Sequence, residues 1–125
     1  MFKKLFASNT EGSSWEALEA APQLAEILEH SKSKPVLIFK HSTRCSISSM
    51  ALSRLERQTE TLQTAGIRLF LLNLIVHRNL SNQIEEDFAV RHESPQAILI
   101  QNGVVTYHAS HSDIRAETIL EQLNA

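Results

Sequence analysis

Cys45 is the one cysteine of this 125-residue chain, and it follows a short polar turn. An apolar strand pattern ends at Phe39, and a helical pattern begins at Ser46. The first turn of a helix carries unpaired backbone N–H groups and the positive end of the helix dipole, which favour a thiolate. Lys40 and Arg44 could add positive charge if their side chains point at the sulfur. An inert buried side chain is the ordinary alternative for a lone cysteine. The place between a strand and a helix favours a reactive thiol, able to carry out thiol–disulfide exchange.

Ser48 stands three residues after the cysteine, in the place of the second cysteine of a C-x-x-C redox helix. Its hydroxyl could donate a hydrogen bond to the sulfur of Cys45 and stabilise the thiolate. A hydroxyl forms no disulfide, so an outside thiol would have to resolve any mixed disulfide on Cys45. Serine is also common in the first turn of helices as a capping residue, and the C-x-x-S pattern alone therefore does not prove redox chemistry.

Ser94 and Pro95 precede an apolar strand pattern. Proline has no N–H to donate to a sheet, so it is tolerated at the start of a strand. A bond before proline can adopt the cis form at low cost, but only about 5–6% of such bonds do so in folded proteins. The local sequence therefore favours an ordinary trans bond.

The six histidines invite a metal interpretation. His92, His108 and His111 lie in different predicted elements without the spacing of a metal motif, so no metal site is predicted. His41, which lies beside the polar turn before Cys45, could affect the acidity of the thiol. The plain alternative is a solvated histidine at a strand end. A cysteine hydrolase would need a histidine base beside Cys45, with His108 or His111 as candidates, and is kept as a minor alternative.

The elements that would position these residues alternate between helices and strands. A segment at 15–18 fits either an edge strand or the entry to a helix. The other expected elements are a helix at 22–30, a strand at 36–39, a helix from 46 to about 62 based on apolar Ile47, Met50, Leu52 and Leu55, a strand at 67–73, a helix at 79–90, a strand at 96–101, a hairpin turn at Asn102–Gly103, a strand at 104–108, and a closing helix capped by Ser112. This order predicts an α/β sandwich with a mixed sheet of four or five strands flanked by about four helices.

Length and composition limit the possibilities further. The chain is long enough for one domain, 1–125, in which the polar segment 1–13 is expected to be loosely held. A net charge of −2 argues against a nucleic acid or an anionic membrane held by bulk charge, and no apolar stretch is long enough to span a bilayer. One cysteine excludes an internal disulfide, and no apolar run follows Met1–Phe6 as it would in a signal peptide. We therefore expect a cytoplasmic protein.

Three segments resemble one known family. Residues 39–48 are F-K-H-S-T-R-C-S-I-S, residues 92–97 are H-E-S-P-Q-A, and residues 108–114 are H-A-S-H-S-D-I. They resemble the segments F-K-H-S-T-x-C-P-I-S, H-E-S-P-Q and S-H-x-D-I of the monothiol bacilliredoxins, the YtxJ-like group of the thioredoxin superfamily. The resemblance covers the chain from about Lys34 to its end. One departure is Ser46, where the family usually has proline. This change should loosen the helix entry, and it leaves the cysteine in place.

The resemblance implies a thioredoxin-like fold in which Cys45 is the nucleophile and Pro95 is a cis-proline. It implies removal of bacillithiol, a small cysteine-containing thiol, from S-thiolated client proteins through a mixed disulfide on Cys45. Bacillithiol is then a co-substrate, no cofactor is bound, and no nucleic acid or membrane is a partner. In this interpretation Ser48 stabilises the thiolate, Ser94 offers backbone hydrogen bonds to the client, and Pro95 shapes the groove. The approach is lined by Ser42, Thr43 and Arg44, and the guanidinium of Arg44 is able to contact a carboxylate of the thiol.

Three other functions fit the same residues. A broader thiol transferase would act with a different small thiol. A non-catalytic binding module would use the thioredoxin fold and the groove between Cys45 and Pro95 to hold a partner. A redox sensor would change a partner interaction when Cys45 is oxidised, without turnover.

Overall fold

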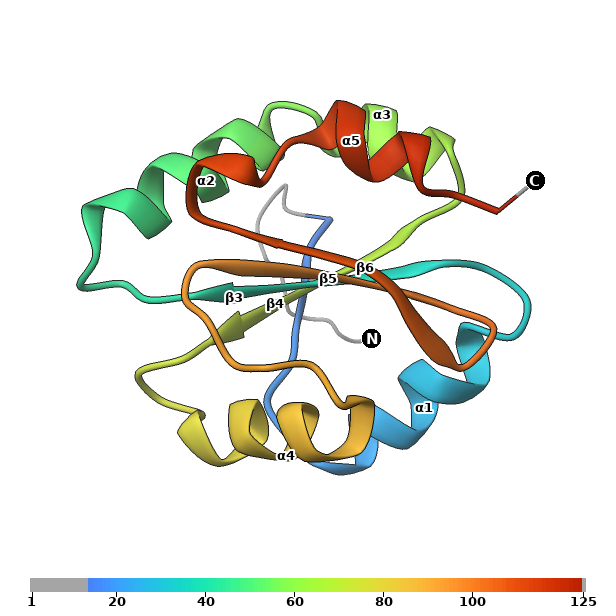
Figure 1. The fold of residues 1–125 in the computed structure, drawn as a ribbon, viewed down its shortest axis with the longest axis horizontal. Helices are drawn as coiled ribbons and strands as arrows, with labels where there is room; N and C mark the ends of the chain where they lie inside the picture. Colours follow the sequence, from blue (N-terminus) through green and yellow to red (C-terminus); the bar gives the residue numbers. More distant parts are fainter. Residues whose placement is uncertain (1–13, 125) are drawn as a thin grey trace.

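A five-stranded mixed sheet lies between two layers of helices in the computed structural model, which describes residues 14–124 (Figure 1). The expected loose segment 1–13 lies outside the described residues. The strands are β2 (Glu16–Ala17), β3 (Val36–His41), β4 (Arg68–Asn73), β5 (Gln96–Gln101) and β6 (Val104–Ser110). The α-helices are α1 (Pro22–His30), α2 (Ser46–Glu56), α3 (Thr59–Thr64), α4 (Arg78–Phe88) and α5 (Ala116–Glu121), and a 3₁₀ turn spans His111–Asp113. None of the helices in this part of the chain is long and apolar enough to cross a membrane.

β3 is the central strand in the order β2-β4-β3-β5-β6. It runs parallel to β4 and antiparallel to β5, so the ends of β3 and β4 and the start of β5 meet at one edge of the sheet, on the left in Figure 1. Lys40 pairs with Gln96 across the β3–β5 ladder. This register brings residues 42–45, called the cysteine turn below, beside the segment before β5, which ends at Pro95.

β3 continues to His41, two residues further than the apolar pattern at 36–39 predicts. All six of its residues are buried, because helices cover both faces of the strand. Successive side chains point to opposite faces. Phe39 packs in the core beneath α2, α3 and α5, whereas Ile38 packs in the core on the side of α1 and α4. The same alternation directs His41 to the first side and Lys40 to the second.

The α/β sandwich with a mixed sheet is confirmed, but the single helix expected from 46 to about 62 is wrong, since the structure has α2 and α3 there. Gln58 between them leaves helical geometry, with φ −108° and ψ 14°. The hydroxyl of Thr59 donates to the carbonyl of Glu56 (2.8 Å) and accepts from Nε1 of Trp15 (2.9 Å). A threonine hydroxyl that bonds to nearby backbone competes with a regular helix, which explains the break.

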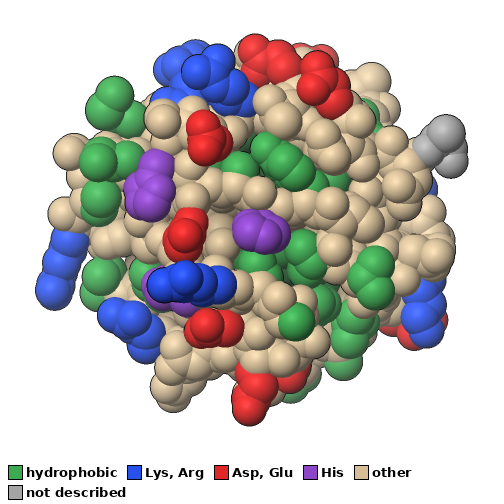
Figure 2. Space-filling view, viewed as in Figure 1, with side chains coloured by type: hydrophobic (Ala, Val, Ile, Leu, Met, Phe, Trp, Pro, Cys, Tyr) green, Lys and Arg blue, Asp and Glu red, His purple; other side chains and the backbone are tan. Residues whose placement is uncertain are grey.

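The buried face of α2 also differs from the apolar pattern. Ser48, Ala51 and Leu55 face the core, whereas Ile47 and Met50 are 52% and 64% exposed. Hydrophobic side chains accordingly reach the surface at the end of the molecule where α2 begins (Figure 2). Residues three and four apart share a helix face. The small side chains at 48 and 51 allow α2 to lie close to the sheet, which favours this face over the more apolar one.

The closing helix begins later than expected, at Ala116 and not just after Ser112. Ser112 lies in the 3₁₀ turn, and His111 before it has a left-handed backbone with φ 56°. The guanidinium of Arg54 donates hydrogen bonds to the carbonyls of His111 (3.5 Å) and Ile114 (3.1 Å), which stabilises this turn. Ile114 is buried and extended, so the helix can begin only after it.

The hairpin turn at Asn102–Gly103 forms as predicted, with positive φ at both residues (55° and 83°). Its tip is bonded to the end of α1. The N–H of Asn102 donates to the carbonyl of Ser31 (2.7 Å), and the N–H of Gly103 donates to the hydroxyl of the same serine (2.9 Å). β5 is therefore held at the end that lies opposite the cysteine edge of the sheet.

Candidate active site

Cys45 is the N-cap residue of α2, with an extended backbone (φ −119°, ψ 120°) and a half-buried side chain. Its N–H donates to the carbonyl of Ser42 (3.2 Å), and its carbonyl accepts the N–H of Ser49 (3.1 Å). Cys45 therefore stands at the start of the first helical turn, and its side chain makes no capping hydrogen bond to the N–H groups of that turn. The backbone N–H groups of that turn can stabilise a thiolate or a sulfur that becomes negative during disulfide exchange.

Ser48, in the first turn of α2, is fully buried, and its hydroxyl has two partners. The oxygen accepts the backbone N–H of Ser42 (3.0 Å) and lies 2.7 Å from Nδ1 of His41. Within residues 14–124 no hydrogen bond joins this hydroxyl to the sulfur of Cys45. The position of a second redox cysteine is thus filled by a serine that holds the cysteine turn to β3.

His41 is only 9% exposed and lies on the α2 side of β3. This burial corrects the interpretation of a solvated histidine at a strand end. Burial also lowers the pKa of the imidazole, although the carboxylate of Glu56 opposes the shift. The ring is therefore neutral near pH 7, and its Nδ1 can accept the hydroxyl hydrogen of Ser48. The expected hydrogen bond from Ser48 to the sulfur of Cys45 is absent from residues 14–124, and the hydroxyl contacts His41 and Ser42 instead.

The remaining residues of the cysteine turn are open to solvent. Thr43 and Arg44 are exposed, and Ser42 is half-buried. Arg44 makes no ion pair within the part of the chain that the structure describes. Its guanidinium is therefore available to a ligand that carries a carboxylate. The three residues predicted to line the approach directly precede Cys45 in the turn after β3.

The segment at residues 91–95, called the Pro95 loop below, lies beside the cysteine turn through the β3–β5 register. The bond between Ser94 and Pro95 is cis, as the family resemblance implies and unlike the trans bond that the local sequence favours. The hydroxyl of Ser94 is buried without a hydrogen-bond partner. Its backbone N–H and carbonyl also lack one among the described residues. Ser94 is therefore a half-buried residue whose polar groups have no hydrogen-bond partner among residues 14–124.

Lys40 and His92, which no pattern in the sequence pairs, meet on the other side of the sheet. Lys40 has no exposed surface, and its ammonium lies 3.3 Å from Nδ1 of His92. The hydroxyl of Ser81 in α4 lies 3.1 Å from the same nitrogen. Burial lowers the pKa of Lys40 to about 8, although Glu85 opposes the shift. The positive charge of Lys40 is thus directed at the Pro95 loop and not at the sulfur of Cys45.

The histidines form neither a metal site nor a hydrolase site within residues 14–124. No group of three or more histidine, cysteine, aspartate or glutamate side chains in this range is arranged to hold a metal ion. No histidine nitrogen in the same range is hydrogen-bonded to the sulfur of Cys45, as a cysteine hydrolase requires. The two bonded rings near the site, His41 and His92, contact Ser48, Lys40 and Ser81.

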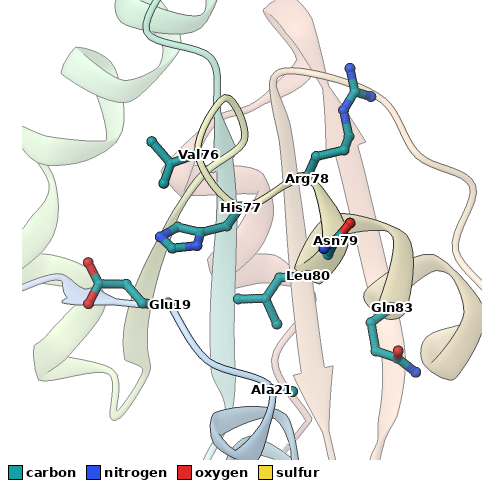
Figure 3. A pocket seen from close by; sticks show the side chains of 8 residues that line it. All are labelled: Glu19, Ala21, Val76, His77, Arg78, Asn79, Leu80 and Gln83. Atoms are coloured by element: carbon teal, nitrogen blue, oxygen red, sulfur yellow. The ribbon is translucent and has the colours of Figure 1, made fainter.

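A surface hollow of about 370 Å³ lies at the start of α4 (Figure 3). Val76 and His77 come from the loop before α4 and Leu80 from its first turn, while Glu19 and Ala21 come from the segment before α1. None of the residues predicted for the thiol site lines this hollow. It is therefore separate from the cysteine turn and the Pro95 loop.

Several solved structures resemble this fold. One, described as a candidate oxidoreductase with a thioredoxin fold, is 28% identical and aligns with a TM-score of 0.75 over 87% of this chain and 93% of its own. Thioredoxin O2 from Arabidopsis thaliana is 16% identical, with a TM-score of 0.70 over 90% of this chain and 96% of its own. A thioredoxin from Malassezia sympodialis is 14% identical, with a TM-score of 0.71 over 87% and 90%. The chain therefore has a thioredoxin-like fold.

One family matches most of the sequence. Residues 16–119 match the family described as monothiol bacilliredoxin BrxC. The match runs from β2 into α5 and includes both the cysteine turn and the Pro95 loop. Together with the oxidoreductase-type structural neighbour, it supports a function in thiol redox chemistry. The chain belongs to the monothiol bacilliredoxin family.

Proposed function

We propose that this protein removes bacillithiol from S-bacillithiolated client proteins in the cytoplasm, through a mixed disulfide on Cys45. The observation that carries the proposal is the position of the single cysteine. Its half-buried sulfur stands at the start of α2, and buried Ser48 occupies the second redox position. Such a site can take one small thiol at a time and cannot release it by forming an internal disulfide.

In the first step, the thiolate of Cys45 attacks the bacillithiol sulfur of the client's mixed disulfide. A new sulfur–sulfur bond forms at Cys45, the bond to the client sulfur breaks, and the client leaves as a thiolate that takes a proton from water. The N–H groups at the start of α2 stabilise the thiolate of Cys45 before the attack.

In the second step, an outside thiol frees Cys45. Its thiolate attacks the bacillithiol sulfur, forms a disulfide with it and releases Cys45 as a thiolate. Ser48 holds the cysteine turn throughout the cycle. Because its hydroxyl makes no hydrogen bond to the sulfur of Cys45 within residues 14–124, Ser48 acts on the thiolate by positioning the turn.

The two sides of the site bind different parts of the substrate. The unpartnered backbone groups of Ser94 bond to the client chain, and Pro95 shapes the groove beside the sulfur. Ser42 and Thr43 line the approach of the small thiol. The exposed guanidinium of Arg44 binds a carboxylate of that thiol.

Mass spectrometry of the purified protein tests the proposal. The protein is incubated with oxidised bacillithiol and, separately, with oxidised glutathione, and then with a client that carries a bacillithiol mixed disulfide. We expect a bacillithiol adduct on Cys45 and release of the free client thiol, and neither in Cys45→Ser. The matched control Ser49→Ala changes an exposed serine of the same helix and should leave both reactions unchanged.

Each contrary result has a defined meaning. An adduct with glutathione in place of bacillithiol would make the protein a transferase for another small thiol. A stable adduct on Cys45 without release of the client thiol would favour a redox sensor, and no adduct with either thiol would favour a binding module. Full activity of Cys45→Ser would overturn the mechanism.

A further inference from the structure

His92 attaches the Pro95 loop to the buried side of the sheet. Its Nδ1 lies 3.3 Å from the ammonium of Lys40 in β3 and 3.1 Å from the hydroxyl of Ser81 in α4. In Figure 1 the chain returns from α4 across this side of the sheet to the edge where α2 begins. Lys40 and Ser81 are completely buried, so the contact joins the loop to the core of the protein.

Gln96 holds the same loop from the neighbouring strand. It pairs with Lys40 across the β3–β5 ladder, and its side chain is also completely buried. The side-chain amide donates to the carbonyl of Arg91 (2.9 Å) and accepts the N–H of Glu93 (3.3 Å). These bonds hold the backbone on both sides of His92, so Lys40 and its ladder partner Gln96 both attach the loop to the sheet.

The pKa shifts and the hydrogen bond between the two side chains together give the charge state of the pair. An ammonium only donates, so Nδ1 of His92 accepts from Lys40 and the ring proton is on Nε2. Burial and the cations of Lys40 and Arg78 lower the pKa of His92, whereas Glu85 in α4 and Glu93 in the loop oppose this shift. Burial lowers the pKa of Lys40 to about 8, again against Glu85. Near pH 7, Lys40 is therefore charged and His92 is neutral.

We propose that Lys40 and His92 are positioning residues that hold the Pro95 loop in place for the client chain, and that protonation of His92 releases the loop. A protonated Nδ1 can no longer accept from the ammonium, and the two cations then repel each other. The same N–H can donate to the hydroxyl of Ser81, so the ring exchanges one partner for another. Client capture weakens in acid as a result. The inference rests on the proposed function in taking the Pro95 loop as one wall of the client groove.

Nuclear magnetic resonance tests the release without any client. Between about pH 7.5 and about pH 4.5, the backbone amides of Glu93 and Ser94 should shift together with the titration of the His92 ring. Lys40→Met keeps the length of the side chain and removes its charge. In that variant the ring should titrate at a higher pH, and the loop amides should respond less. If the ring titrates in the wild-type protein while both amides stay unchanged, the inference is overturned.

Activity gives an independent readout. The measured quantity is the kcat/KM of the wild type divided by that of His92→Asn. Any effect of pH on the reacting thiols is common to both proteins and drops out of this ratio. Asparagine offers an acceptor that does not titrate, so the ratio should fall about five-fold from about pH 7.5 to about pH 5, mainly through KM. His30→Asn, at a partly exposed histidine in α1, should follow the wild type. A ratio that stays constant would overturn the inference.

The two readouts separate this inference from the proposed function. If no thiolated client reacts with any variant but the loop amides follow His92, the proposed function fails and the positioning pair stands. If clients react while the ratio stays constant, the function stands and the inference fails. If Lys40→Met does not fold, the NMR titration of the wild type and the kcat/KM ratio with His92→Asn still test the inference.

Discussion

Lys40 and His41 are consecutive residues of β3 that point to opposite sides of the sheet, and each holds one side of the candidate site. His41 faces α2 and contacts the hydroxyl of Ser48, which fixes the cysteine turn. Lys40 faces α4 and contacts His92, which fixes the Pro95 loop. The end of one strand thus positions both the cysteine turn and the Pro95 loop.

The two contacts differ in how they respond to a proton. A hydroxyl both donates and accepts, so Ser48 can bond to His41 whether Nδ1 is protonated or not. An ammonium only donates, so Lys40 loses its acceptor when His92 is protonated. The comparison indicates that the His41–Ser48 contact survives protonation of its histidine, whereas the Lys40–His92 contact does not.

The largest expected effect of a single change lies on the α2 side. Ser48→Ala removes the partner of Nδ1 in buried His41 and of the partly buried N–H of Ser42. Each unsatisfied group costs about 1–3 kcal/mol, so the free energy of unfolding should fall by about 3 kcal/mol in urea denaturation at neutral pH. The exposed control Ser49→Ala should lose less than about 0.5 kcal/mol. Equal losses in both variants would show that the Ser48 bonds contribute no stability.

The next effect lies on the α4 side and depends on pH. Because the pKa of Lys40 is lowered from 10.5 to about 8, the unfolded chain binds a proton between these values that the folded chain has lost. The free energy of unfolding should therefore rise with pH in this window by about 2 kcal/mol relative to Lys40→Met. Urea denaturation from about pH 7 to about pH 10 measures the difference. Lys34→Met, at an exposed lysine, should run parallel to the wild type, and parallel behaviour of Lys40→Met would contradict the prediction.

The smallest effect concerns His41 in acid. Its pKa is lowered in the folded protein, so as the pH falls below about 6.5 the unfolded chain takes up a proton first and stability is lost. His41→Asn removes this titration and should lose less stability than the wild type between about pH 6.5 and about pH 5. The difference should be smaller than that for Lys40, because Ser48 can still accept from a protonated ring. In His30→Asn the free energy of unfolding should depend on pH as it does in the wild type. If His41→Asn also shows the wild-type pH dependence, His41 is not the group responsible.

The parts of the site that follow from local sequence could be predicted. Cys45 and Ser48 are three residues apart at a helix start, and the order of apolar runs gives the sheet that brings them to its edge. The Asn102–Gly103 hairpin forms because only a few residue types adopt positive φ easily, and such residues are visible in a sequence. The cis bond before Pro95 followed from the family resemblance, since local sequence favours trans.

The parts that depend on contacts between distant segments could not be predicted. Lys40 and His92 are 52 residues apart, and periodicity does not mark a lysine as buried, because lysine is almost never fully buried without a partner. The buried face of α2 could not be predicted either, since its exposed Ile47 and Met50 are more apolar than its buried Ser48. In both cases the packing of neighbouring elements overrides the hydrophobic pattern.

The bonds between Ser31 and the tip of the hairpin have a consequence at the opposite end of β5. The six residues of the strand rise about 3.3 Å each, so the tip lies roughly 20 Å from Pro95. A slip of one residue would turn Gln96 to the wrong face of the sheet and separate it from Lys40. By binding the hairpin tip, Ser31 helps to fix the register of β5. The hydrogen bonds at the end of β5 farthest from Pro95 thus help to fix the position of the proline along the strand.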